Sequence, residues 1–285
     1  MTTRSVTRVV TAHQQLEGAG FLVRRPLPTR GLELCDPFLL VDEMGPFDLA
    51  PGKATGAPDH PHRGFETVSY ILEGEVEHED SAGNRGFIGA GDVQWMTAGR
   101  GIVHSEMPSR RIVAEGGRVH GFQIWVNLPA RDKMMAPRYQ EVPAAKIPSA
   151  VSSDGKAQVR VIAGSALGVQ AVIDTRTPIL YQDWTLSAGA SVEQAVPADF
   201  QGFAYVFAGS AEVGGKTLGS GQLGLLGPGD SVHLSSTTKA RLLLLAGQPI
   251  NEPVARYGPF VMNTEAELHQ AVRDFQSGKL GEIRR

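Results

Sequence analysis

Two short polar pairs carry the side chains with which this chain could do chemistry. His60-Pro61-His62 places two imidazoles at positions i and i+2, and His104-Ser105-Glu106 places an imidazole and a carboxylate with the same spacing. Residues i and i+2 of an extended chain point to the same side, so each pair can direct both polar side chains at one ion. Pro61 stiffens the first pair because it fixes its own φ and keeps the preceding residue extended.

Together the two pairs predict a metal site. His60, His62, His104 and Glu106 supply three neutral imidazoles and one carboxylate, a mixed nitrogen and oxygen donor set without a thiolate. Such a set suits iron, manganese, cobalt, nickel, copper or zinc, and it excludes soft-metal and iron–sulfur sites. On an octahedral ion, four protein ligands would leave two neighbouring positions open for a substrate and dioxygen.

The competing interpretation is that these histidines are ordinary surface or core residues, because two such pairs can arise by chance. Turns at Gly83–Asn84 and Gly89–Asp92 favour the metal site, since they can bring the two pairs side by side. Five of the eight histidines also fall between residues 60 and 120. His120 is a weaker candidate for a pocket wall, and Arg63 is expected to form a structural ion pair.

Short strands must position these side chains. Apolar runs rich in β-branched and aromatic residues are separated by Gly, Pro, Asn and Asp at near-regular intervals, for example at 65–72, 93–97 and 204–207. This pattern predicts an all-β sandwich or barrel. Helical periodicity emerges only near the end, where Thr264 and Glu267 form a capping box before an apolar stripe.

A length of 285 residues suggests two domains. The strand pattern lapses between residues 127 and 155, where four prolines and a small polar segment mark the best boundary. We therefore expect an N-terminal metal-binding barrel over residues 1–135. A degenerate C-terminal barrel with a short terminal helix is expected over residues 136–285.

The two halves also resemble each other weakly, which predicts a duplicated β-barrel unit. Tyr70–Gly74 matches Tyr205–Gly209, and Gly89–Asp92 matches Gly227–Asp230. In this alignment the four ligand positions are occupied in the second half by Ala195, Pro197, Leu242 and Leu244. The second barrel should therefore hold no metal, and His233 there stands alone.

Composition excludes several classes of function. The chain has 27 Lys and Arg against 30 Asp and Glu, a net charge of −3 that disfavours binding of nucleic acid through bulk charge. No segment approaches the roughly 18 apolar residues that a membrane span needs. The single cysteine, Cys35, excludes an intramolecular disulfide and indicates a reducing compartment, and its apolar neighbours predict an inert, buried thiol. We expect a cytoplasmic protein without a nucleic-acid or membrane partner.

Several long motifs resemble the pirin family of bicupins. The resemblance is carried by His60–Val68, Gly91–Gly99, Gly101–Glu106, Ile124–Pro129 and Tyr257–Thr264. It implies two stacked cupin barrels of the jelly-roll type, with one Fe2+ held in the N-terminal barrel by His60, His62, His104 and Glu106. In the general cupin pattern the carboxylate would be Glu66. Here Glu66 is either a residue that orients a ligating imidazole or a satisfied strand residue.

The resemblance also implies an activity. Many bacterial pirin-like proteins are described as quercetin 2,3-dioxygenases, so the expected substrates are a planar aromatic flavonol and dioxygen, with Glu106 as the catalytic base. Phe65, Trp95, Met96, Phe122 and Trp125 are candidate pocket walls, with ordinary barrel core as the alternative. Whether the chain is an enzyme stays open. Eukaryotic pirins act as iron-dependent regulators through protein contacts, and other cupin enzymes could use the same ligands. The family is often monomeric.

Overall fold

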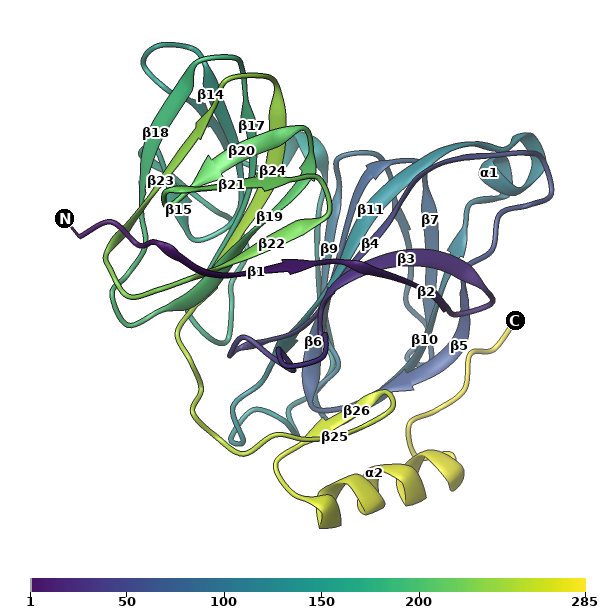
Figure 1. The fold of residues 1–285 in the computed structure, drawn as a ribbon. Helices are drawn as coiled ribbons and strands as arrows, with labels where there is room; N and C mark the ends of the chain where they lie inside the picture. Colours follow the sequence, from purple (N-terminus) through teal and green to yellow (C-terminus); the bar gives the residue numbers. More distant parts are fainter. Residues whose placement is uncertain (1) are drawn as a thin grey trace. The chain divides into compact units, whose positions relative to one another are not determined.

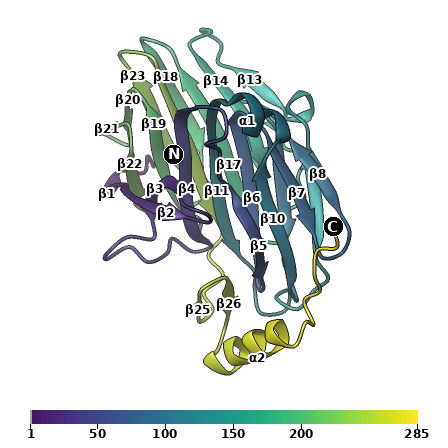
Figure 2. The ribbon, with the colours of Figure 1, turned by 90° about the vertical axis from the view of Figure 1, so that its right-hand side faces the viewer.

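The computed structural model describes residues 2–285, which form two compact units. The first unit to be described holds the predicted ligands and comprises residues 14–25, 38–144 and 250–285. Its larger sheet has seven strands, in the order β12 (Arg138–Val142), β9 (Val93–Thr97), β6 (Phe65–Glu73), β11 (Gly117–Asn127), β4 (Phe38–Leu49), β3 (Phe21–Leu27) and β2 (His13–Glu17). Its smaller sheet has four, in the order β5 (Ala57–His62), β10 (Ile102–Pro108), β7 (Val76–Asp80) and β8 (Arg85–Ile88) (Figure 1, and Figure 2 for β8).

The same unit contains two helices and a short hairpin. The helices are α1 (Arg110–Glu115) and α2 (Glu265–Gln276), and the hairpin pairs β25 (Ala255–Tyr257) with β26 (Phe260–Met262). The predicted capping box is present, because Glu267 N–H donates to Thr264 Oγ1 and Thr264 N–H donates to Glu267 Oε2. Helix α2 lies beside the hairpin (Figure 2) and buries its apolar stripe in a cluster that includes Phe260 and Val103. The helix therefore steadies the hairpin.

The second unit comprises residues 2–13, 26–37 and 145–249. Its seven-stranded sheet has the order β1 (Val6–Thr11), β22 (Gln222–Leu226), β19 (Gln201–Ala208), β24 (Ala240–Gly247), β17 (Ile179–Leu186), β14 (Ala157–Ala163) and β13 (Ser149–Val151). Its four-stranded sheet has the order β18 (Ala190–Ala195), β23 (Ser231–Ser236), β20 (Ser210–Val213) and β21 (Lys216–Gly219). A small pair, β15 (Ser165–Ala166) with β16 (Val169–Gln170), and a 3-10 turn, η1 (Ala144–Lys146), complete the elements.

Each unit therefore combines a seven-stranded sheet with a four-stranded one, which confirms the prediction of an all-β chain. The second unit is filled by aliphatic side chains from both sheets, among them Val159, Leu218 and Leu242. Neither helix within residues 2–285 has the length and apolar character that a crossing of a lipid bilayer requires.

The grouping of the chain differs from the single boundary expected after residue 135. Strand β1, near the N-terminus, pairs with β22 and so belongs to the second unit. Residues 250–285, including α2, belong to the unit that holds the predicted ligands. Composition along the chain marks local breaks, whereas these groupings arise from pairings between segments more than 200 residues apart.

Candidate metal centre

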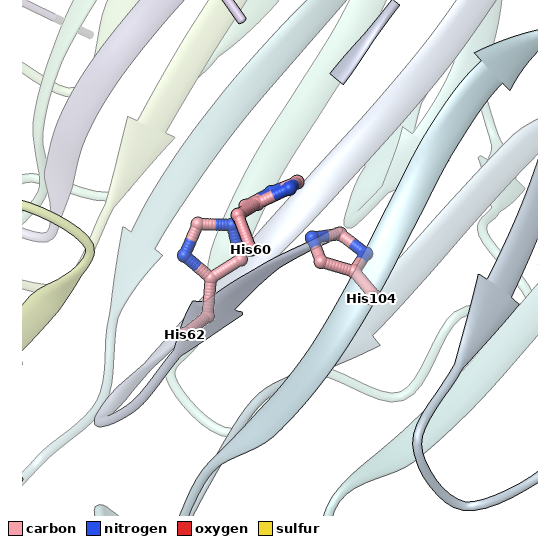
Figure 3. A group of neighbouring side chains, drawn as sticks. All are labelled: His60, His62 and His104. Atoms are coloured by element: carbon pink, nitrogen blue, oxygen red, sulfur yellow. The ribbon is translucent and has the colours of Figure 1, made fainter. Parts of the chain in front are cut away.

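Three predicted ligands meet inside the first unit. His60 and His62 lie on β5 and His104 on the neighbouring β10, where His60 and His104 are direct cross-strand partners. Figure 3 shows the three rings close together. Their centroids are 4.3 to 4.9 Å apart, and one ring nitrogen from each lies within 4.8 Å of the others. The i and i+2 spacing thus brings His60 and His62 together, and the pairing of β5 with β10 adds His104.

Hydrogen bonds orient two of the three rings. His60 Nδ1 lies 2.7 Å from the Pro58 carbonyl oxygen, and His62 Nδ1 lies 3.4 Å from that of Pro259. A carbonyl oxygen can only accept, so each Nδ1 carries the proton and each Nε2 presents a lone pair. The two Nε2 atoms are 3.1 Å apart. Two lone pairs facing each other at that distance repel, and a metal ion bound by both nitrogens would remove the repulsion.

His104 supplies a second observation that fits a metal. Its side chain is 1% exposed, and neither ring nitrogen has a hydrogen-bond partner within residues 2–285. Burying an unpaired polar atom costs about 1–3 kcal/mol, so such atoms in native proteins need an explanation. A metal ion bound to one ring nitrogen provides one.

The electrostatics keep two of the imidazoles, His62 and His104, neutral, as metal ligation requires. Burial lowers the pKa of His62 well below its ordinary value, and repulsion from His60 adds to the effect. Burial likewise lowers the pKa of His104 well below its ordinary value, followed by repulsion from the other imidazoles around it. Both rings therefore present lone pairs rather than protons near neutral pH.

The turn after His62 is held by contacts from distant segments. Gly64 has a φ of +89°, and a Cβ there would lie 1.9 Å from the Val261 carbonyl oxygen, so only glycine fits. The buried Lys133 ammonium donates to the carbonyl oxygens of Gly64 at 2.8 Å and Val261 at 3.1 Å, and to Asn127 Oδ1 at 2.6 Å. Nothing in the spacing of the motifs signals this role for Lys133, because its partners come from three separate segments.

Arg63 and Glu66, the charged neighbours of this turn, also have structural partners. Arg63 forms the predicted ion pair, with Nη1 2.9 Å from Asp274 Oδ2 on α2. Glu66 is 1% exposed and accepts a hydrogen bond of 2.6 Å from Thr97 on the neighbouring strand β9. That contact agrees with the interpretation of Glu66 as a satisfied strand residue.

Glu106 lies two residues beyond His104, past an irregularity in the pairing of β10 with β5. Its carboxylate accepts a hydrogen bond of 2.5 Å from Ser69 Oγ on one oxygen and one of 2.8 Å from Gln123 Nε2 on the other. The close group of potential ligand atoms consists of the three imidazoles and does not include Glu106. The carboxylate is therefore held beside the imidazoles by β6 and β11, and its role as fourth ligand stays a prediction.

A large cavity reaches the site. It has a volume of about 970 Å³ and is lined by His60, His62 and Glu106. His120 also lines it and lies 2.9 Å from Glu43 Oε1. Among the five aromatic and Met candidates for the wall, Trp125 lines the cavity. The other four are buried in the core: Phe65, Trp95, Met96 and Phe122.

One buried histidine near the site was not singled out from the sequence. His78 on β7 stands directly opposite Glu106 on β10, with its ring centroid 5.4 Å from that of His104. It is 1% exposed, and its two ring nitrogens have no hydrogen-bond partner in the part of the chain described. The clustering of five histidines between residues 60 and 120 was the only signal that could have found it.

The second unit repeats the topology but not the ligands. By position in its sheet, the counterpart of β10 is β23 and that of β5 is β18. Leu242 and Leu244 lie on β24, the counterpart of β11, so aligning them with His104 and Glu106 was wrong by one strand. Glycine-rich turns flank β22 on both sides, and the sequence match selected the later one. His233 lies on β23 and its Nε2 is 2.9 Å from Ser191 Oγ.

The repeated two-sheet unit and the imidazole group together define a bicupin with a candidate mononuclear metal centre. A family model described as "Pirin" matches residues 20–126, and one described as "Pirin C-terminal cupin domain" matches residues 181–281. The chain belongs to the pirin family. The resemblance and the fold class predicted from the sequence are thereby confirmed.

Similar proteins span nearly the whole chain. A pirin-like protein of Solanum lycopersicum is 46% identical over 283 residues, covering 98% of this chain and 93% of that protein. Human pirin is 44% identical over 285 residues, covering 98% and 94%. A solved structure described as quercetin 2,3-dioxygenase from Acinetobacter baumannii has a TM-score of 0.93 and 36% identity, and it covers 99% of this chain and all of that one.

Proposed function

We propose that this protein is a metal-dependent dioxygenase that cleaves flavonols such as quercetin. The observation that carries the proposal is the 970 Å³ cavity lined by His60 and His62, two of the three clustered imidazoles. Ligand pockets commonly measure about 300–1,000 Å³, so the cavity has room for a flavonol and dioxygen together. The similarity to a structure described as a quercetin 2,3-dioxygenase supports this substrate class.

His60, His62 and His104 would hold the metal, with Glu106 as the fourth ligand. Fe2+ is the proposed ion, and Mn, Co, Ni, Cu or Zn would fit the same donor set. When bound, such an ion supplies a Lewis acid for an ionised hydroxyl and, if it is redox-active, reactivity with dioxygen. A bound metal ion would give a partner to one of the ring nitrogens of the buried His104, which have none in the described chain.

The reaction must remove a proton from the flavonol, and the cavity contains a side chain that can accept it. The Glu106 carboxylate would accept the proton of the flavonol 3-hydroxyl, as a general base within the cavity. Ser69 and Gln123 each donate to one of its oxygens and fix its orientation. The ionised flavonol then reacts with dioxygen, and its ring opens with release of carbon monoxide.

The test is an incubation of iron-loaded protein with quercetin under argon and under air. We expect oxygen-dependent loss of the flavonol absorbance, with matching oxygen uptake and carbon monoxide release. A Glu106→Ala variant should lose most of this rate, whereas His233→Ala, the same substitution at a histidine of the other unit, should keep it. A wild-type rate no higher than that of Glu106→Ala would refute the proposal.

If the protein is instead an iron-dependent regulator that acts through protein contacts, the iron-loaded protein should not consume quercetin. That role requires metal binding without turnover, and retention of a protein partner by the ferric form alone. A cavity of this size beside the imidazoles favours catalysis, because a surface contact with a protein does not need one. Metal analysis of the freshly purified protein would also identify the native ion.

A further inference from the structure

One wall of the cavity is not apolar, as the sequence suggested, but charged, because Arg25, Arg256, Glu17 and Asp42 all line it. Arg256, on β25 of the C-terminal hairpin, lines the cavity together with Trp125. Its guanidinium carbon lies 4.8 Å from the centre of the Trp125 ring, and the Trp125 ring also packs against Phe65 at 4.3 Å. A planar ligand that enters beside Trp125 therefore meets a guanidinium rather than a bare indole face.

Arg256 lies near two carboxylates, Asp42 and Glu17, that are already paired with Arg25. Its Nη1 donates to the Leu39 carbonyl oxygen at 3.3 Å, and it forms no salt bridge within residues 2–285. Most of its five N–H donors thus remain available. Partial desolvation, followed by repulsion from Arg25, lowers the pKa of Arg256. The carboxylates of Asp42 and Glu17 act in the opposite direction, and an acidic ligand oxygen at the free N–H donors would add to their effect.

The other charged groups of the wall are mostly committed. Arg25 pairs with both Asp42 at 2.5 Å and Glu17 at 2.7 Å, so its charge is more than neutralised. Four further lining carboxylates are paired with arginines that do not line the cavity. These pairs are Asp48 and Glu73 with Arg118, Glu75 with Arg111, and Asp59 with Arg285. Arg256 and the exposed Lys53 are the lining cations without such a pair in the described chain.

The distance from Arg256 to the metal centre suits a ligand of flavonol size. The ring centres of Trp125 and His62 are 5.2 Å apart. With the guanidinium carbon 4.8 Å from Trp125, it can lie no more than 10.0 Å from the His62 ring. A molecule of two or three fused or linked rings can therefore reach both groups at once.

We propose that Arg256 recognises adjacent phenolic oxygens of the substrate, at the end away from the hydroxyl that faces the imidazoles. The planar guanidinium donates parallel hydrogen bonds, a geometry that matches two neighbouring oxygens of an acidic phenol. The cavity would then select polyhydroxylated aromatics over those with the metal-facing hydroxyl alone. This inference rests on the proposed function, since it takes a flavonol as the occupant.

The test measures binding, so that it does not depend on turnover. Protein loaded with redox-inactive Zn2+ is dialysed under argon against quercetin or against 3-hydroxyflavone, which lacks the other hydroxyls. An Arg256→Gln variant should weaken quercetin binding about tenfold, the size of one charge-assisted hydrogen bond at an accessible site. Binding of 3-hydroxyflavone should change less than about twofold.

Two controls make every outcome decisive. Arg131→Gln makes the same substitution at an exposed arginine that does not line the cavity, and it should leave both affinities unchanged. Arg256→Lys keeps the charge but not the planar fork, and should recover part of the quercetin affinity. Equal loss for both flavonols, or no loss for either, would overturn the role of Arg256 alone. Wild-type protein that binds neither flavonol would overturn the proposed function with it.

Discussion

Replacing His104 by leucine should abolish metal binding, preserve stability at pH 7 and make stability less dependent on pH. In the metal-free protein, His62 and His104 are buried, and burial holds the pKa of each well below the ordinary value of 6.5. The unfolded chain therefore binds more protons than the folded chain as the pH falls below 6.5. Above pH 6.5 neither state binds these protons, so the free energy of unfolding is at its full value. Below that pH, proton binding by the unfolded chain lowers the free energy of unfolding.

The size of the effect follows from the proton balance. Between pH 6.5 and pH 5, protonation of one unfolded histidine stabilises the unfolded state by about 1.6 kcal/mol. Two buried imidazoles that stay neutral should together cost the folded state about 3 kcal/mol over this interval. His104→Leu should remove about half of that loss. It also removes two unpartnered buried nitrogens, so the variant should be at least as stable as the wild type at pH 7.

The assay is urea unfolding of chelator-treated wild type, His104→Leu and His233→Leu between pH 5 and pH 7. The control histidine is half-buried, bonded to Ser191 and belongs to the other unit. Metal binding by His104→Leu should be lost in parallel. If His104→Leu keeps the full pH dependence of the wild type, the burial argument for this imidazole is wrong.

Two further predictions concern the turn at Gly64 and the buried thiol of Cys35. Gly64→Ala should destabilise the protein by at least about 2 kcal/mol more than Gly83→Ala, because both glycines have positive φ but only the first meets a backbone oxygen, that of Val261. Equal melting temperatures of the two variants would contradict this reasoning. Cys35 is 3% exposed, and burial raises the pKa of its thiol to about 12. A thiol reagent should therefore label it roughly a thousandfold more slowly in the native protein than in urea at pH 8, and rapid native labelling would show that the thiol is accessible.

Local patterns were enough to predict the strands and the type of donor set. Alternating apolar runs between turn residues predict β-structure because a strand exposes its two faces in turn. The spacing of His60-Pro61-His62 directed two imidazoles to one side in the same way. The capping box of α2 was equally local, since both of its hydrogen bonds join residues three apart. Each of these features depends on neighbours in the sequence.

The repeat between the two halves of the chain could be read correctly from the sequence at one strand only. The strand that begins the repeat was aligned correctly at Tyr70 and Tyr205, which lie on β6 and β19 in equivalent places of their sheets. The second match failed because two similar glycine turns flank β22, and composition does not say which of them precedes the equivalent strand. Only the order of strands in the sheet resolved the choice.

The amino-acid order alone thus determined an all-β chain of the pirin family, with three imidazoles and a carboxylate as candidate ligands. The tertiary structure decided which of them meet, because convergence depends on how β5, β10 and β6 are placed and not on spacing within one strand. It also brought Pro259 to His62, Val261 to Lys133, and Arg256 to the cavity wall. Those contacts join residues far apart in the chain, and they form only when the packing of the whole unit has fixed the backbone.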